Sequence, residues 1–123
     1  MKEGSVAALS PRLPMGRFVR PPALLPLISI CLSELRRDIA SLIESQWAEA
    51  PRRRTRDLVS AIEEACDRQG LKAMANLARS MRMLICLPDE EVLELGSALS
   101  EKLEELLRKA EWVASDELRR HKA

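Results

Sequence analysis

The residue types that usually carry out catalysis are scarce in this chain of 123 residues, and their spacing does not bring them together in one site. The single histidine, His121, lies in a charged run near the end, without the desolvated and oriented setting that a general base needs. Carboxylates occur as neighbours, such as Glu63 with Glu64 and Glu104 with Glu105, which diverge by about 100° around a helix axis. We therefore predict no catalytic residues, no metal site and no cofactor, and we expect that the chain is not an enzyme.

The three cysteines, Cys31, Cys66 and Cys86, form no close pair, and each falls within an apolar helical pattern. Buried thiols outside disulfide bonds are the expected state, which favours a reducing compartment. The apolar segment Ala23–Leu32 is too short to span a bilayer, and Pro26 interrupts it. The sequence thus predicts a cytoplasmic location and no membrane contact.

Arg52, Arg53, Arg54 and Arg56 form the densest basic cluster of the chain. Cations are poorly placed at the start of a helix, where the dipole is already positive, so the cluster indicates an anionic ligand or an acidic partner surface. A solvated loop between helices is the other interpretation. Nucleic acid remains open but is not favoured, because aromatic residues, on which bases stack, make up only 2% of the chain.

The elements that position these residues follow from apolar spacing. Apolar residues recur in steps of three and four between Pro88 and Val113, which predicts one long helix with an acidic first turn. Gly96 lies within this helix, and we expect a close helix contact there to offset the propensity cost of glycine. The stripe consists of Val92, Leu95, Leu99, Leu103, Leu106, Ala110 and Val113.

Three further helices are predicted before it. The first begins near Pro26, carries Trp47 at the end of its stripe and is ended by Pro51. The second has Thr55 as its N-cap, Asp57 in its first turn and Gly70 just after its end. The third covers Leu71–Ile85, and the short connections make neighbouring helices antiparallel.

These elements define an all-α fold, an antiparallel four-helix bundle. Residues 1–23 are rich in proline and lack a sustained period, so we expect a flexible arm that is disordered or extended. Residues 24–115 form the helical bundle, and residues 116–123 form a charged C-terminal tail. The Leu-rich stripe of the last helix could also pack against a second copy, so a homodimer is left open.

The segment Leu58–Leu107 resembles the histidine phosphotransfer (HPt) domains of bacterial two-component signalling. Asp67-Arg68-Gln69-Gly70 is similar to the turn of that family, and Leu77-Ala78-Arg79-Ser80-Met81-Arg82-Met83 falls where its Leu-Ala-His-x-Leu-Lys-Gly motif stands. Arg79 takes the place of the phosphorylated histidine, Arg82 that of the lysine and Met83 that of the glycine. The resemblance therefore implies a degenerate, HPt-like domain that has lost phosphotransfer and keeps a docking surface for receiver domains.

The leading hypothesis is a non-catalytic protein-interaction module, an adaptor or scaffold, that binds a protein partner through Arg79, Arg82 and Met83. In the other interpretation of these arginines, they are simply exposed residues three apart on one helix. The alternative function is an accessory protein that binds anions or nucleic acid through the cluster at residues 52–56.

Overall fold

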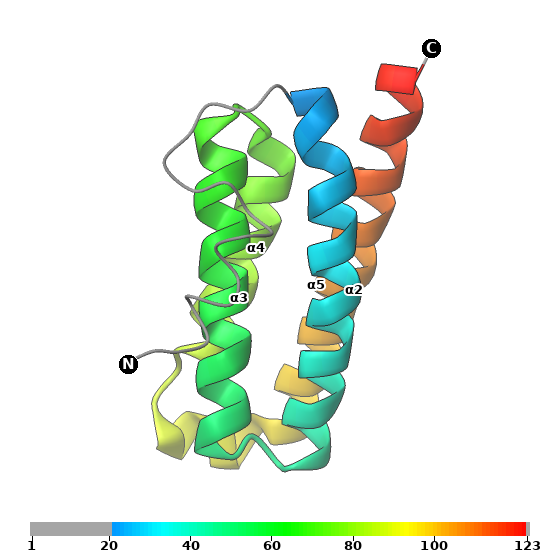
Figure 1. Ribbon diagram of the computed structural model, residues 1–123. Coiled ribbons are helices and arrows are strands. Elements are labelled where there is room, and N and C mark those ends of the chain that lie inside the picture. The colour runs from blue at the N-terminus through cyan, green and yellow to red at the C-terminus, as the bar shows by residue number, and fades with distance from the viewer. Residues whose placement is uncertain (1–20, 123) are drawn as a thin grey trace.

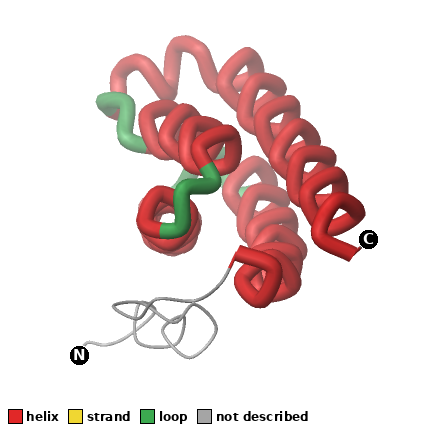
Figure 2. Tube along the Cα trace, turned by 90° about the horizontal axis from the view of Figure 1, so that it is seen from above, coloured by secondary structure: helices red, strands yellow, loops and turns green. Residues whose placement is uncertain are grey.

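Helices make up most of residues 21–122, the part of the chain that this computed structural model describes. They run alternately up and down, and each packs against two neighbours around a square, as Figures 1 and 2 show. The predicted all-α, antiparallel four-helix bundle is confirmed, and no strand occurs among the described residues. The helices are α2 (Pro21–Glu44), α3 (Glu49–Arg68), α4 (Lys72–Ile85) and α5 (Asp89–Lys122).

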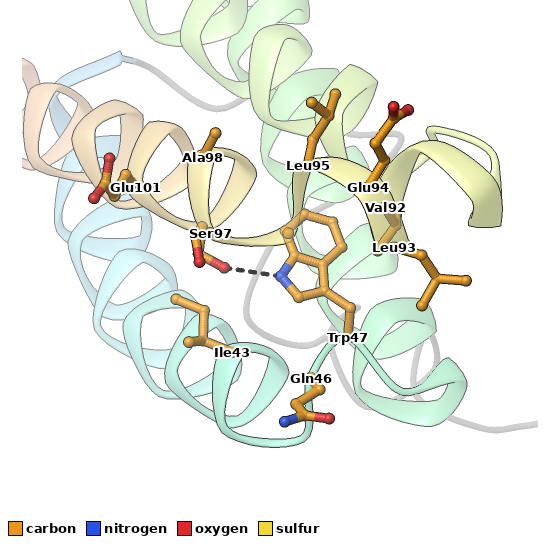
Figure 3. A pocket seen from close by; sticks show the side chains of 12 residues that line it. Ile43, Gln46, Trp47, Val92, Leu93, Glu94, Leu95, Ser97, Ala98 and Glu101 are labelled. Carbon is orange, nitrogen blue, oxygen red and sulfur yellow. Dashed lines mark hydrogen bonds between the residues drawn. The ribbon is translucent and has the colours of Figure 1, made fainter.

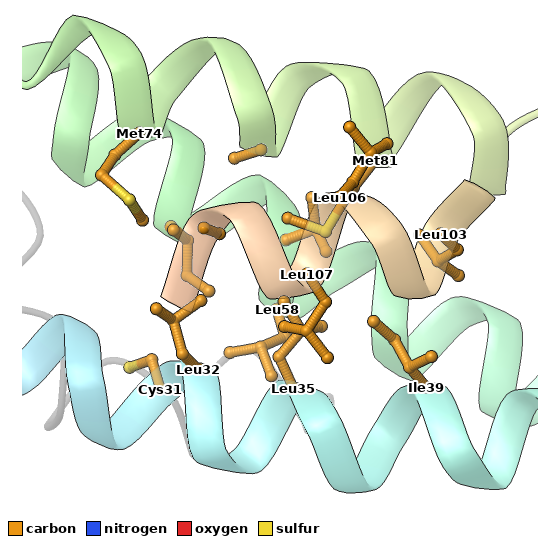
Figure 4. Packing of buried hydrophobic residues seen from close by; sticks show 14 of the residues in the cluster. Cys31, Leu32, Leu35, Ile39, Leu58, Met74, Met81, Leu103, Leu106 and Leu107 are labelled. Carbon is orange, nitrogen blue, oxygen red and sulfur yellow. The ribbon is translucent and has the colours of Figure 1, made fainter. Parts of the chain in front are cut away.

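The core between the helices consists mainly of aliphatic and methionine side chains, together with Cys31, Cys66 and Trp47 (Figure 4). Each helix contributes residues spaced three and four apart, because that spacing places side chains on one face of a helix. Truncating a leucine, isoleucine or methionine of this core to alanine should cost about 2–5 kcal/mol. The largest fully buried side chains are Leu25, Ile28, Leu35, Ile39, Leu42, Leu58, Ile62, Met74, Met81 and Ile85.

The start of α2 differs from the prediction. The helix begins at Pro21, so residues 21–23 of the predicted arm are helical, while residues 1–20 lie outside the described part. Pro21 and Pro22 are tolerated because the first N–H groups of a helix have no acceptor within it. Pro26 lies inside the helix, where proline cannot donate a backbone hydrogen bond, and the nearby Leu25 and Ile28 are fully buried.

The end of α2 also lies earlier than predicted, at Glu44 rather than near Pro51. Gln46 and Trp47 follow with φ of 57° and 63°. The N–H of Gln46 donates to the Ile43 carbonyl (3.0 Å) and that of Trp47 to the Leu42 carbonyl (2.7 Å), which closes the helix with a Schellman-type turn. Trp47 is therefore not part of a helical stripe, although its side chain is buried.

The N-terminus of α3 was predicted incorrectly. The helix begins at Glu49, so Pro51 occupies its first turn, where proline is allowed. Thr55 is not an N-cap but a buried residue inside the helix, and its hydroxyl donates to the Pro51 carbonyl (2.7 Å). Asp57 accordingly lies beyond the first turn. The N-cap residue is Ala48, which makes no side-chain cap hydrogen bond, and its own N–H donates to the hydroxyl of Ser45 (3.2 Å).

Gly70 does follow the end of α3 as predicted, with φ of 75°. Its N–H donates to the Asp67 carbonyl (3.2 Å) in a second Schellman-type turn. The long helix α5 has the predicted acidic first turn but continues to Lys122, so residues 116–122 are helical and not a separate tail. Asp116 pairs with Arg119 and Arg120 one turn later, which supports this extension.

Candidate functional site

Arg79 and Arg82 of α4 share one carboxylate, that of Glu63 on the neighbouring helix α3. The Nε of Arg82 lies 2.7 Å from Oε1 of Glu63, and the Nε of Arg79 lies 3.1 Å from Oε2. Arg79 also donates through Nη1 to the side-chain oxygen of Asn76 (3.1 Å). The side chain of Glu63 is only 16% exposed, and the hydrogen bond from Arg82 is the main reason that its pKa is lowered.

Met83 lies on the same surface of the bundle. It follows Arg79 by four residues, so both project from one side of α4, and its side chain is 61% exposed. The structure thus brings Arg79, Arg82 and Met83 together, and we name these three residues the α4 face. Together with Glu63, whose carboxylate pairs with both guanidinium groups, the α4 face carries a formal charge of +1.

The basic cluster lies in the N-terminal half of α3, and its members point in different directions. Arg52 pairs with Asp89 at the start of α5 (2.8 Å), whereas Arg54 reaches toward Asp38 of α2 (3.8 Å). Arg53 pairs with Glu49 (2.8 Å) and Arg56 with Asp57 (3.4 Å). The cluster therefore does not act as one uncompensated patch of positive charge.

Three of these arginines nevertheless line one surface pocket of about 550 Å³, which we name the basic hollow. Arg52, Arg53 and Arg56 come from α3, and the carboxylates of Glu49 and Asp89 share the lining. The Nε of Arg52 is buried without a hydrogen-bond partner. Arg54 does not line the pocket, so the structure brings together three of the four residues that we expected to bind an anion.

A second pocket, of about 730 Å³, adjoins the first, and the sequence reasoning missed it (Figure 3). We name it the Trp47 hollow, since the indole of Trp47 lines it and donates through Nε1 to the hydroxyl of Ser100 (3.0 Å). Leu93 and Leu95 of α5 stand at the pocket, and Leu93 is 86% exposed. Leu93 falls outside the apolar stripe of α5. An apolar residue that departs from the helical spacing of the stripe is the sequence signal that could have identified Leu93 as exposed.

Gly96 also lines the Trp47 hollow. A Cβ at this position would meet no heavy atom within 4 Å, so the close helix contact that we expected is absent. Among residues 21–122, no packing contact therefore offsets the propensity cost of this glycine.

The cysteines differ from one another. Cys31 and Cys66 are buried as predicted, and burial raises the pKa of Cys66 to about 12. Cys86 is exposed, contrary to the prediction, because α4 ends at Ile85 and leaves it in the connection to α5. The side chain of His121 lies outside the described side chains, and within the described part no group of three His, Cys, Asp or Glu residues could hold a metal ion.

No helix among residues 21–122 combines the length and hydropathy that crossing a membrane requires. Comparisons with known proteins identify no family: no family model matches the chain, and neither a curated protein nor a solved structure is significantly similar to it. The function must therefore be argued from the surface of the bundle.

Proposed function

We propose that the protein is a non-catalytic helical adaptor that binds a partner protein through the α4 face. The supporting observation is the exposed Met83 beside two guanidinium groups that Glu63 holds in place. Arginine and methionine are enriched in protein interfaces. Side chains that are already ordered lose little conformational entropy on binding, which improves affinity.

The partner that fits this face carries carboxylates around an apolar centre. Arg79 and Arg82 have donors beyond those bonded to Glu63, and hydrogen bonds from guanidinium groups to carboxylates are strong. The HPt-like resemblance assigns a receiver domain to this role. The helix–turn–helix order of α3, Gly70 and α4, with the motif-like segment in α4, supports that assignment.

The test is a pull-down of the tagged full chain from its own cells, read by mass spectrometry, followed by direct binding of the recovered partner. The substitution Met83→Glu should abolish binding, because it places a charge at the apolar centre without disturbing Glu63. Charge reversal of Arg79 and Arg82 should do the same. The control carries Arg37→Glu and Arg108→Glu, two exposed positions elsewhere on the bundle, and should bind normally.

Recovery of receiver-domain proteins that Met83→Glu releases would support both the adaptor function and the HPt-like assignment. Recovery of other proteins with the same dependence would support the adaptor function and reject the assignment. Partners that the wild-type chain and all three variants retain equally would reject the α4 face.

The alternative function, binding of an anion or nucleic acid, is supported by one observation: Arg52, Arg53 and Arg56 line one pocket. It predicts retention on heparin that falls steeply with salt. Arg53→Ser with Arg56→Ser should remove this retention while leaving Arg52, which is paired with Asp89, in place. Retention that persists in the double variant would reject the pocket.

We also propose a cytoplasmic location. The buried thiols of Cys31 and Cys66 fit a reducing compartment, where such groups persist outside disulfide bonds. Detection of the tagged protein in the fractions of lysed cells tests this proposal. Recovery in the cytoplasmic fraction would support it, and recovery in another fraction would contradict it.

A further inference from the structure

Leu93 is the most exposed of the large apolar side chains in the described part of the chain. It lines the Trp47 hollow together with Leu95, whose side chain is also exposed (Figure 3). Apolar side chains so exposed beside a cavity gain free energy only when another surface covers them. The location therefore indicates a contact surface.

The carboxylates of this surface lack counter-charges. Glu94 and Glu101 line the Trp47 hollow, where no lysine or arginine occurs among the described residues. Glu90 and Glu91 extend the acidic surface into the first turn of α5, and none of the four carboxylates makes an ion pair or a hydrogen bond within residues 21–122. The arginines of the adjoining basic hollow do not compensate for them, because each already pairs with a carboxylate. The segment that covers this surface should therefore be both apolar and basic.

The chain has a segment of this composition outside the described part. Residues 1–20, which we name the leading segment, contain four basic residues against Glu3 as the single acidic one, a formal charge of +3. Within it, Val6–Leu9 is an apolar run, with Lys2 before it and Arg12 after it. An apolar run between cations is the composition that the surface around Leu93 requires.

The distance along α2 limits which part of the leading segment can reach the Trp47 hollow. The hollow lies at the far end of α2 from Pro21, and the 24 residues of this helix separate the two by about 36 Å (Figure 1). An extended chain covers at most about 3.3–3.6 Å per residue. Leu9, twelve residues before Pro21, can therefore span about 40 Å and reach the hollow. Leu13, eight residues before Pro21, can span only about 29 Å and cannot reach it.

We propose that Val6–Leu9 of the same chain packs against Leu93 at the Trp47 hollow, with the cations of the leading segment facing Glu94 and Glu101. A linked segment meets its site at an effective concentration of about 1 mM when the linker can span the distance, so even weak contacts suffice. None of the residues of the α4 face belongs to this surface. The docking of the leading segment and the proposed adaptor function can therefore succeed or fail independently.

The experiment is paramagnetic relaxation enhancement, read by NMR on the full chain. A nitroxide is attached at Ser5→Cys in a Cys86→Ser background, since the remaining Cys31 and Cys66 are buried. Relative to the reduced, diamagnetic label, the amide signals of residues 92–101 should lose most of their intensity. Those of residues 72–77, at the other end of the bundle, should keep it.

Variants of the hollow test which side chain receives the segment. Leu93→Glu should restore the signals, because it removes the apolar contact. The matched control, Trp112→Glu, changes another exposed apolar residue of α5 and should leave the loss of signal in place. Glu94→Lys with Glu101→Lys should restore the signals as well, since it brings like charge against the leading segment.

Variants of the leading segment test the reach. Val6→Ser with Leu9→Ser should restore the signals, whereas Leu13→Ser with Met15→Ser should not, since Leu13 and Met15 stand too close to Pro21 to reach the hollow. Both pairs remove two apolar side chains and leave the charge unchanged.

A mixed sample separates docking within one chain from docking between chains. It combines nitroxide-labelled chains without isotope with isotope-labelled chains without nitroxide, and no loss of signal is expected in it. Loss of signal in the mixed sample would show docking on a second copy and overturn the proposal. Full signal in the starting protein, a loss of signal that any of the restoring variants leaves in place, or restored signals in either control would also overturn it.

Discussion

Replacing Gly96 with alanine is expected to stabilise the bundle by about 1 kcal/mol. Glycine inside a helix loses more backbone entropy on folding than alanine does, and α5 extends well beyond Gly96 on both sides. No contact within the described part of the chain opposes the gain, because a Cβ at this position meets no heavy atom within 4 Å beyond its chain neighbours and the backbone of its own helix. For a domain of this size the change corresponds to a rise in Tm of about 4 °C.

Gly70 supplies the matched control. A Cβ there also meets no heavy atom within 4 Å, but Gly70 has φ of 75°. Alanine is strained in this left-handed conformation by about 1–2 kcal/mol, so Gly70→Ala should destabilise the bundle. Glycine-to-alanine substitution is thus expected to raise the free energy of unfolding at position 96 and to lower it at position 70. Because a Cβ is uncrowded at both positions, the backbone angle φ accounts for the difference.

The assay is urea unfolding followed by far-UV circular dichroism, with the m-value compared among the three proteins. Loss of stability in Gly96→Ala would show that an atom packs against this position. A neutral Gly70→Ala would show that the turn after α3 does not require a positive φ. Either result refutes the reasoning.

Three further predictions concern other parts of the bundle. Gln46→Gly should raise the free energy of unfolding by about 1 kcal/mol, because glycine relieves the positive φ at the end of α2, and urea unfolding measures it. Glu63→Gln should lower the free energy of unfolding near neutral pH. Because the pKa of Glu63 is lowered in the folded protein, this loss of stability should persist above pH 4.5 and disappear as the pH falls through the pKa of the folded protein. Urea unfolding at several pH values measures it. A thiol reagent at neutral pH should modify Cys86 rapidly and Cys66 only after denaturation, because Cys66 is buried with a pKa of about 12; equal rates in the native protein would contradict this.

The helices themselves were predictable from the sequence, because a stripe of apolar residues with a helical period forms a stable structure only when it is buried. The residues at which the helices begin and end were less predictable. The sequence pattern predicts that one helix starts near Pro26 and ends at Pro51, whereas both prolines lie inside helices. Whether proline ends a helix depends on its distance from the first turn, and packing decided where that turn lies. Thr55 is a second example, because threonine often caps a helix but here is a buried residue inside α3.

The candidate sites were likewise predictable only where they depend on spacing along one helix. That Arg79 and Met83 share a face follows from their spacing on one helix. That Glu63 holds Arg79 and Arg82 depends on how α3 packs against α4, and nothing in the local sequence encodes it. The division of the basic cluster between a pocket and Asp38 likewise depends on which helices flank α3.

The sequence by itself determined the fold class, the composition of the core and the turn at Gly70, because all of these depend on local spacing and backbone preference. Only the tertiary structure decided which charges are neutralised and where the surface is hollow. The Trp47 hollow needs a tryptophan from the connection after α2 beside Leu93 of α5, two residues far apart in the chain. Such a juxtaposition arises from side-chain packing between helices, which periodicity along one helix does not specify.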